Sequence, residues 1–514
     1  MEYFRNLPTL LAQVVTSRLR DVALITKDAE YTYSDILRLS LEWSTILEKY
    51  STDQTNRVAI FSNKSVESYA LILACNVNGI VYSCLDQDGP KERTQSMIDV
   101  LDPAFIIKFD KTISIERKGK SSELHLSSLD SNADTDHAIE QWLKAKSRLV
   151  PETRAAYVMF TSGSTGFPKG VVISHQSLCY FIQWAKCEYK IDKHDVISGL
   201  NQVHFDNSIF DFYCSLYNGA RLAPVNKNDI MHPKKAIEQL DACGVTIWFS
   251  VPSYLIFCKK MKSLKCGVLP SLRAFIFGGE GFPKHQLVQL FSMFSEQVQF
   301  YNVYGPTETT CICSSYLVTE KDFDDHQNNL CPLGTLAPNF EYQIVEQDPA
   351  TGIGELVLYG AQTALGYLND KQRTYEKFKY FDNETGYIRP GYRTGDLVFV
   401  DEDHLLHFKG RVDFQIKHMG YRIELEEVEK AFQIENFIVE AVATYRVNDG
   451  VSGEILLHYT LEETASDRFS PEDSFKQWSK KLPSYMRPSV FIKHDQIPKN
   501  RNGKIDRKKL NGKY

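Results

Sequence analysis

Residues 158–175 read VMFTSGSTGFPKGVVISH, an apolar stretch that leads into a loop rich in hydroxyl groups and glycine. The apolar run is typical of a buried strand. The loop supplies hydroxyl donors, glycines whose backbone N–H groups an anion can approach, and one cation: Thr161, Ser162, Ser164 and Thr165, Gly163 and Gly166, and Lys169. These groups predict a polyphosphate site, although such a cluster by itself is also typical of an ordinary turn. The spacing is not that of a P-loop, because Gly170 follows Lys169 where a metal-binding serine or threonine would stand.

The bulk composition describes a multidomain globular protein. At 514 residues the chain is too long for one hydrophobic core, and a prior of roughly 150 residues per domain predicts about three compact units. Apolar residues make up 43% and charged residues 24%, and the net charge is −6. This balance offers no basic surface for nucleic acid or for an anionic membrane, so neither is expected as a partner.

The cysteines and the N-terminus indicate a cytoplasmic protein. The 11 cysteines include no C-x-x-C pair, which favours free thiols in a reducing compartment. The chain does not open with a basic segment and a long apolar run, and no window reaches the about 18 apolar residues that a membrane span needs. We therefore expect neither export nor a membrane span.

Alternating strand and helix patterns predict an α/β fold for residues 1–410. After an amphipathic helix between Phe4 and Leu19, the order strand, helix, strand at 57–61, 66–75 and 80–82 implies parallel pairing. The pattern returns at 245–249, 273–277, 284–294 and 298–301. We expect two stacked α/β sheets with helices on both faces. Residues 111–137 are rich in serine and aspartate without a clear period, which predicts a surface excursion or a weakly ordered linker.

A smaller α+β unit is predicted after residue 410. Helices are expected at 424–432 and 472–480, and strands at 441–445, 454–459 and 489–493. The unit has about 100 residues, enough to fold by itself. We place an N-terminal core at 1–410, a hinge at 411–413 and a mobile C-terminal domain at 414–514.

Three further motifs follow the loop in order: NVYGPTETT at 302–310, YRTGDL at 392–397 with GRVDFQIK at 410–417, and NGKIDR at 502–507. Together with residues 158–175 they resemble the motifs of the adenylate-forming superfamily, which includes acyl-CoA ligases, luciferases and the adenylation domains of nonribosomal peptide synthesis. The resemblance covers almost the whole chain, from Tyr31 to Leu510. It implies an enzyme that uses ATP and Mg²⁺ to activate a carboxylate as an adenylate.

The resemblance assigns nucleotide contacts to these motifs. It implies that Thr161, Ser162, Thr165 and Lys169 hold the β- and γ-phosphates, with Gly163, Ser164 and Gly166 in the same loop, and that Glu308 anchors Mg²⁺. Thr307 would reach the α-phosphate, Tyr304 would face adenine, Asn302 and Gly305 belong to the same segment, and Gly279, Glu280 and Gly281 would form the rim that reads the base edge. Asp396 and Arg411 would bind the ribose. Lys504 would be the catalytic lysine that bridges the substrate carboxylate and the α-phosphate, alongside Thr307 and Lys169. Singly, such residues have ordinary structural explanations, such as a core ring for Tyr304.

The segment HFDNSIFD at 204–211 resembles the motif that places an aspartate against the α-ammonium group in amino-acid adenylation domains. A buried carboxylate needs a charged partner, which fits Asp206 facing a cationic substrate. The alternative is that Asp206 or Asn207 caps a helix that starts near Ser208. By the same resemblance the rest of the pocket wall is uncharged, which implies a neutral substrate side chain of small or medium size: Asn207, Phe210, Ser250, Ile276, Gly278, Val303, Cys311 and Ile312.

The segments FQIK at 414–417 and GYRIELEEVE at 420–429 resemble the D-alanine ligases that load carrier proteins for teichoic-acid modification. Where this chain has Gly278, those ligases typically carry a cysteine linked to the D-isomer, so the chirality of the substrate stays open. In the family the C-terminal unit swings about a hinge, here Asp413, and opens a thiol channel beside Gly420. Because no Asp-Ser-Leu type phosphopantetheine site follows, we expect the acceptor to be a separate carrier protein acting in trans.

Two other functions are compatible with the motifs. An acyl- or aryl-CoA ligase would share nearly all of them but would not need Asp206. A non-catalytic binding protein would have no chemical reason to keep Lys169, Glu308, Asp396 and Lys504 together. The leading hypothesis is therefore an ATP-dependent ligase that activates an amino acid.

Overall fold

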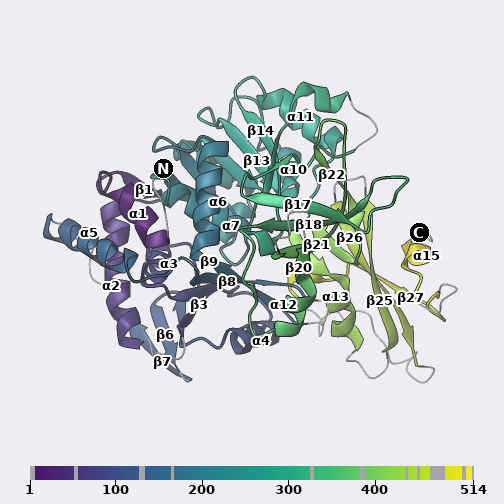
Figure 1. Ribbon diagram of the computed structural model, residues 1–514, viewed down its shortest axis with the longest axis horizontal. Coiled ribbons are helices and arrows are strands. Elements are labelled where there is room, and N and C mark those ends of the chain that lie inside the picture. Colours follow the sequence, from purple (N-terminus) through teal and green to yellow (C-terminus); the bar gives the residue numbers. More distant parts are fainter. Residues whose placement is uncertain are drawn as a thin grey trace.

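The protein is described by a computed structural model over residues 6–50, 56–117, 119–126, 133–163, 167–324, 329–382, 388–433, 438–448, 452–462, 481–499 and 505–511. Within these residues, three sheets build a large N-terminal part and two small sheets build a C-terminal subdomain (Figure 1).

Residues 158–161 and 169–174 belong to β8 and β9, which pair antiparallel in an eight-stranded sheet with the order β19-β9-β8-β4-β3-β5-β6-β7. β3 pairs in parallel with β4 and β5, which confirms the pairing predicted from the strand-helix-strand order. The strands of this sheet are β3 (Arg57–Phe61), β4 (Val81–Cys84), β5 (Phe105–Phe109), β6 (Ile113–Arg117), β7 (Lys120–Leu124), β8 (Ala155–Thr161), β9 (Lys169–Ser174) and β19 (Gly366–Tyr367).

A second sheet of nine strands has the order β16-β15-β14-β13-β12-β10-β11-β1-β2. Its centre is parallel, because β10 pairs with β11 and β12, and β13 pairs with β12 and β14, in the same direction. The carboxyl ends of parallel strands share one edge, where ligands bind in open α/β sheets. The strands are β1 (Val22–Ile25), β2 (Glu30–Thr32), β10 (Val196–Gly199), β11 (Arg221–Pro224), β12 (Ile247–Ser250), β13 (Ala274–Gly278), β14 (Gln299–Tyr304), β15 (Ser314–Leu317) and β16 (Thr335–Leu336).

A third sheet is antiparallel and was not among the elements predicted from the sequence. It consists of β17 (Phe340–Val345), β18 (Gly354–Gly360), β20 (Phe378–Asp382), β21 (Ile388–Val400) and β22 (Leu406–Arg411). Its register sets Asp396 on β21 opposite Arg411 at the end of β22. The chain therefore leaves the N-terminal part beside one of the predicted ribose contacts.

Helices cover the two larger sheets, and α3 lies between layers, since nearly every one of its residues is buried. No helix among the described residues is long and apolar enough to cross a membrane. The helices of the N-terminal part are α1 (Leu7–Val15), α2 (Tyr33–Tyr50), α3 (Val66–Asn78), α4 (Lys91–Leu101), α5 (Ala133–Ser147), α6 (His175–Glu188), α7 (Asn207–Ile209), α8 (Lys227–Ile230), α9 (Pro233–Ala242), α10 (Pro252–Lys260), α11 (Lys284–Phe294) and α12 (Lys371–Lys377).

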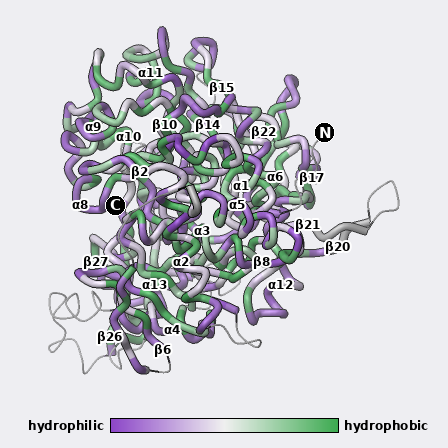
Figure 2. Tube along the Cα trace, turned by 90° about the vertical axis from the view of Figure 1, so that its left-hand side faces the viewer, coloured by the Kyte–Doolittle hydropathy of each residue, from purple (hydrophilic) through white to green (hydrophobic). Residues whose placement is uncertain are grey.

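The C-terminal subdomain has its own apolar core, built from α13 and the strands beside it. Its elements are the hairpin β23 (Gln415–His418) and β24 (Tyr421–Glu424), α13 (Leu425–Gln433), β25 (Ile438–Asn448), β26 (Ser452–Leu461), β27 (Val490–Lys493) and α15 (Arg507–Asn511). Figure 2 shows β26, β27 and α13 together, far from α11 and β15 at the opposite end of the molecule.

Most predicted elements are confirmed, with ends shifted by a few residues; β3 and α11 match the prediction to the residue. The surface excursion predicted for 111–137 is an antiparallel hairpin of β6 and β7 at the sheet edge, which was not predicted as strands, and α5 begins at Ala133. β7 is almost entirely exposed and lacks apolar alternation, and β6 carries only two alternating apolar residues, Ile113 and Ile115, so the pattern by which strands are recognised is weak. The predicted helix at 472–480 lies outside the described residues, as does Phe4.

Candidate active site

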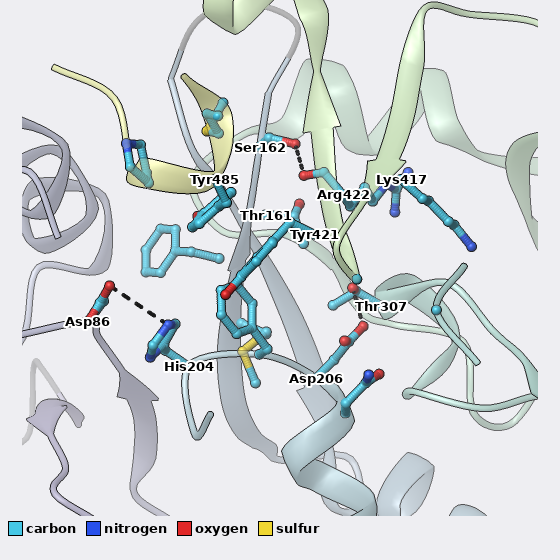
Figure 3. A pocket seen from close by; sticks show the side chains of 18 of the residues that line it. Asp86, Thr161, Ser162, His204, Asp206, Thr307, Lys417, Tyr421, Arg422 and Tyr485 are labelled. Carbon is cyan, nitrogen blue, oxygen red and sulfur yellow. Dashed lines mark hydrogen bonds and ion pairs between the residues drawn. The ribbon is translucent and has the colours of Figure 1, made fainter. Parts of the chain in front are cut away.

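One cavity between the two parts of the molecule is lined by residues of the segments at 158–175, 204–211, 302–310, 392–397 and 410–417 (Figure 3). Four places in the N-terminal part contribute to its lining: the segment after β8, the turn after β14, the segment before α7 and the end of the third sheet. The predicted site residues in the lining are Thr161, Ser162, Asp206, Asn207, Gly279, Gly305, Thr307, Asp396 and Arg411. Residues more than 200 positions apart therefore meet around one space, as the hypothesis of a shared nucleotide site requires.

Ser162 and Gly163, which follow β8, contact the C-terminal subdomain. The Ser162 hydroxyl donates a hydrogen bond to the backbone carbonyl of Arg422 over 2.7 Å, and the Gly163 N–H donates to a carboxylate oxygen of Glu427 over 3.2 Å. The hydroxyl of Ser162 and the N–H of Gly163, which were predicted to bind phosphate, thus donate to oxygen atoms of β24 and α13. Ser164, Thr165 and Gly166 lie outside the described residues.

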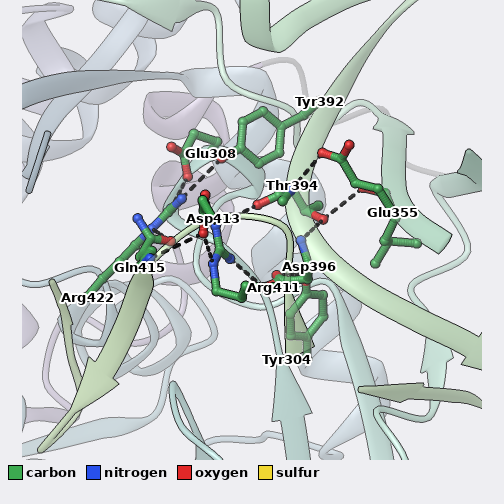
Figure 4. Close-up of polar contacts among 12 residues, drawn as sticks. Tyr304, Glu308, Glu355, Tyr392, Thr394, Asp396, Arg411, Asp413, Gln415 and Arg422 are labelled. Atoms are coloured by element: carbon green, nitrogen blue, oxygen red, sulfur yellow. Dashed lines mark hydrogen bonds and ion pairs between the residues drawn. The ribbon is translucent and has the colours of Figure 1, made fainter. Parts of the chain in front are cut away.

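Glu308 is fully buried and is held by three groups, of which Arg422 is shown in Figure 4. Arg422 Nη1 lies 2.6 Å from Oε2, Lys169 Nζ lies 3.3 Å from Oε1, and the Tyr367 hydroxyl donates to Oε1 over 2.7 Å. Although burial acts in the opposite direction, Arg422 and Lys169 hold the pKa of Glu308 well below its ordinary value. The carboxylate is therefore ionised at neutral pH.

Lys169 is the cation of the phosphate loop, and it is almost completely buried. Burial lowers its pKa to about 8, with Glu308 opposing the shift and Arg422 adding to it. The charge of Lys169 is therefore sensitive to pH just above neutrality.

Asp396 and Arg411, the two predicted ribose contacts, form an ion pair at the cavity edge (Figure 4). The Tyr304 hydroxyl donates to Asp396 over 2.6 Å, and Arg411 also binds Asp413 through Nε at 2.7 Å. Burial would lower the pKa of Arg411, but Asp396 and Asp413 hold it above its ordinary value. Asp413, the predicted hinge residue, is thus tied to the last strand of the N-terminal part.

Asp206 does not cap the helix that follows it, because its side chain makes no capping hydrogen bond to α7. Its carboxylate instead accepts a hydrogen bond from the hydroxyl of Thr307 (Figure 3). Burial raises the pKa of Asp206, while the hydrogen bond from Thr307 opposes this shift. A cationic group in the cavity would relieve this burial cost.

The other predicted wall residues are buried and do not line the cavity: Phe210, Ser250, Ile276, Gly278, Val303, Cys311 and Ile312. Phe210, Ile276 and Val303 belong to the same apolar core cluster. At Gly278, an added Cβ would lie 2.4 Å from the backbone oxygen of Val303 on the neighbouring strand. A cysteine at this position would therefore require β13 and β14 to move apart.

The remaining predicted contacts lie around the cavity. Glu280 and Gly281 line a neighbouring cleft, where the Glu280 carboxylate accepts from the N–H of Gly420 over 2.9 Å. Asn302 donates to the backbone oxygen of Pro332 over 2.7 Å. Lys504 lies outside the described residues.

Five residues of the site did not emerge from the sequence as site residues: Arg93, Tyr367, Lys417, Arg422 and Glu427. Lys417 Nζ lies 5.6 Å from the centre of the Tyr304 ring, within the range of a cation–π contact. Lys417, Arg422 and Glu427 stand in the quoted segments at 410–417 and 420–429, so charged residues just after the hinge were the available signal.

Glu308 suits a metal ion that takes most of its ligands from substrate phosphates and water. Among the described residues no group of three His, Cys, Asp or Glu side chains could hold an ion. Mg²⁺ usually binds one or two carboxylates and completes its octahedron with substrate phosphates and water. A single ionised carboxylate beside a phosphate loop fits that requirement.

Fold, cavity and charges together define an enzyme of nucleotide-dependent carboxylate activation. The sequence matches the AMP-binding enzyme family over residues 11–368, and the chain belongs to that family. It is 29% identical over 497 residues to a D-alanine–D-alanyl carrier protein ligase from Lactococcus lactis, and 28% identical over 501 residues to one from Bacillus thuringiensis. Each alignment covers 95% of both chains.

Solved structures share the fold. A nonribosomal peptide synthetase protein containing adenylation and PCP domains superposes with a TM-score of 0.80 at 21% identity, covering 98% of this chain and 84% of that one. The Vibrio cholerae adenylation domain AlmE, in complex with glycyl-adenosine-5′-phosphate, gives a TM-score of 0.79 at 22% identity, covering 99% and 98%. The prediction of an adenylate-forming fold with a C-terminal subdomain is confirmed.

Proposed function

We propose that the protein activates a small, neutral amino acid with ATP, forms the aminoacyl-adenylate and pyrophosphate, and transfers the aminoacyl group to the phosphopantetheine thiol of a separate carrier protein. The observation that carries the proposal is the single cavity lined by Ser162, Asp206, Thr307 and Asp396. Those residues offer donors for phosphate, a carboxylate for an α-ammonium group and a carboxylate for ribose hydroxyls.

The first half-reaction needs positive charge at the reacting centre. The substrate carboxylate attacks the α-phosphorus, and two unit charges about 4 Å apart repel by roughly 4 kcal/mol at an effective dielectric near 20. Left uncompensated, this repulsion costs about a thousandfold in rate. Lys169, which is buried beside Glu308 in the phosphate loop, would supply fixed positive charge toward the leaving pyrophosphate. Lys504 is assigned to the reacting centre by the sequence motif.

Mg²⁺ would be held by Glu308 and by phosphate oxygens. When bound, the ion would neutralise developing negative charge on the phosphates. In the arrangement observed, Arg422 supplies the counter-charge of Glu308. The carboxylate would exchange this guanidinium for the metal when β24 moves out of the cavity.

The amino acid would be held by its ammonium group against Asp206. The wall behind Asp206 is uncharged and packed into the core, which supports a substrate with little side chain. The names of the relatives agree, since they concern D-alanine ligases and a glycyl-adenylate complex. An acyl- or aryl-CoA ligase would have no use for a buried carboxylate at this place.

The second half-reaction would use the C-terminal subdomain, residues 414–514, turning about the hinge at 411–413. Gly420 lies at the contact between the parts, with its N–H bound to Glu280, and would border the path of the thiol. A cytoplasmic location fits the requirement for ATP and the 11 free cysteines.

The test is ATP–pyrophosphate exchange across a panel of D- and L-amino acids, fatty acids and aryl acids. We expect exchange with glycine or with one isomer of alanine, and much slower exchange by the variant Asp206→Asn at the same amino-acid concentration. Exchange driven by fatty or aryl acids alone would contradict the proposed substrate class. Transfer is then measured with a phosphopantetheinylated carrier protein from the same organism.

A further inference from the structure

Glu427 occupies an anion site that belongs to the N-terminal part of the molecule. One oxygen of its carboxylate forms an ion pair with Arg93, and the other accepts the hydrogen bond from the Gly163 N–H. Arg93 comes from the first turn of α4, and Gly163 comes from the phosphate loop. Both charged side chains are enclosed, with 10% of Arg93 and 4% of Glu427 exposed.

Glu427 would leave this site when the C-terminal subdomain moves, because it stands on α13 of that subdomain. Its neighbour Arg422 likewise takes a place at the loop, where its carbonyl oxygen accepts from the hydroxyl of Ser162. Two successive donors of the phosphate loop, Ser162 and Gly163, are thus bonded to oxygen atoms of the subdomain. ATP phosphates cannot use these donors while the subdomain is in this position.

Movement of the subdomain would take Glu427 away and leave Arg93 facing the same cavity as Thr161 and Ser162. The guanidinium of Arg93 would then present its N–H donors to the cavity without their carboxylate partner. A phosphate group suits the vacated place, because guanidinium binds phosphate through two parallel N–H donors and the backbone N–H of Gly163 points to the same spot.

We propose that Arg93 is a further phosphate-binding residue, which binds the terminal phosphate of ATP and the product pyrophosphate whenever Glu427 is withdrawn. The inference rests on the proposed function and adds to it. Glu427 and pyrophosphate then compete for one site, so the subdomain can dock with Glu427 against α4 only after pyrophosphate has left.

The competing explanation is that Arg93 serves purely as a latch for the docked subdomain. Both explanations predict slower transfer to the carrier protein when the ion pair is lost. Binding of inorganic pyrophosphate separates them, because a latch has no contact with it.

The experiment titrates the full-length wild type, Arg93→Ala, Arg93→Lys and Glu427→Gln with inorganic pyrophosphate in the presence of Mg²⁺, by isothermal calorimetry. Loss of a charge-assisted hydrogen-bonded pair weakens binding by about 10- to 100-fold. We expect a loss of this size for Arg93→Ala, a smaller loss for Arg93→Lys, and equal or tighter binding for Glu427→Gln, which removes the competing anion.

If Arg93→Ala keeps the thermal unfolding midpoint and the pyrophosphate affinity of the wild type, the proposal is overturned and Arg93 only holds the docked subdomain. Absence of pyrophosphate binding by the wild type would overturn it as well. Failure of the proposed function shows itself separately, as a wild type that binds pyrophosphate but catalyses no amino-acid-dependent exchange. As a second readout, the KM for ATP in the exchange reaction should rise in Arg93→Ala and not in Glu427→Gln.

Discussion

In the proposed function, Asp206 is the residue that selects an amino acid as the substrate. Its carboxylate is buried and accepts a hydrogen bond from the hydroxyl of Thr307, so a cationic substrate placed against it would stabilise its ionised form. Asp206→Asn should raise the KM for the amino acid by about 100-fold, the size expected for a lost charge-assisted bond. The KM for ATP should stay nearly unchanged. Steady-state exchange kinetics measure both constants, with Asp192→Asn, an exposed aspartate, as control; equal losses for the two substrates would argue against the assignment.

Lys169 should make ATP use depend on pH. Burial lowers its pKa to about 8, so its charge is present below that pH and is lost as the pH rises through it. The kcat/KM for ATP should therefore fall by up to about tenfold per pH unit on the alkaline side. Lys169→Arg keeps its charge throughout this range and should lack this limb. An alkaline limb that persists in the variant would show that another group titrates.

Among the secondary-structure elements, the position of β24 determines whether Arg422 or a metal ion can bind Glu308 in the proposed function. Arg422 on this strand pairs with Glu308 at 2.6 Å and can do so only while the hairpin lies in the cavity. Arg422→Gln should slow transfer to the carrier by about tenfold or more, through loss of a buried charge pair that favours the docked position. Adenylate formation should remain close to wild type.

Single-turnover measurements of the two half-reactions check this separation. Lys409→Gln, which changes an exposed lysine on β22 of the third sheet, serves as control. A variant Arg422→Gln with slow adenylate formation and normal transfer would contradict the role given to β24.

The elements that sequence analysis predicted best are those with a strong apolar period or run. Residues 57–61 are almost entirely buried and 284–294 carry a helical stripe, and both elements were placed to the residue. The hairpin of β6 and β7 was not predicted, because strands at the edge of a sheet need not alternate between buried and exposed residues. Contacts such as Arg422 with Glu308 link positions 114 residues apart, and no local pattern encodes which face of the subdomain docks.

For the molecule as a whole, a substitution at Gly420 can test whether the subdomain reaches the docked position during the reaction. Its φ is +79°, and an added Cβ would lie 2.4 Å from Cγ1 of Val251 in the N-terminal part. Gly420→Ala should therefore impair transfer by at least about tenfold and leave pyrophosphate exchange intact.

Gly119→Ala is the matched control, because Gly119 has a similar φ of +74° but no atom within 4 Å of an added Cβ. Normal transfer in Gly420→Ala would mean that thioester formation does not pass through this arrangement.

The central claim is that one cavity joins an amino acid to AMP, and the most direct measurement is the identity of the enzyme-bound product. Wild type and Asp206→Asn are mixed with ATP, Mg²⁺ and a mixture of amino, fatty and aryl acids, quenched within one turnover and analysed by mass spectrometry. We expect the adenylate of a small amino acid with the wild type and far less of it with the variant. An acyl- or aryl-adenylate, or an aminoacyl-adenylate that forms equally well without the Asp206 carboxylate, would contradict it.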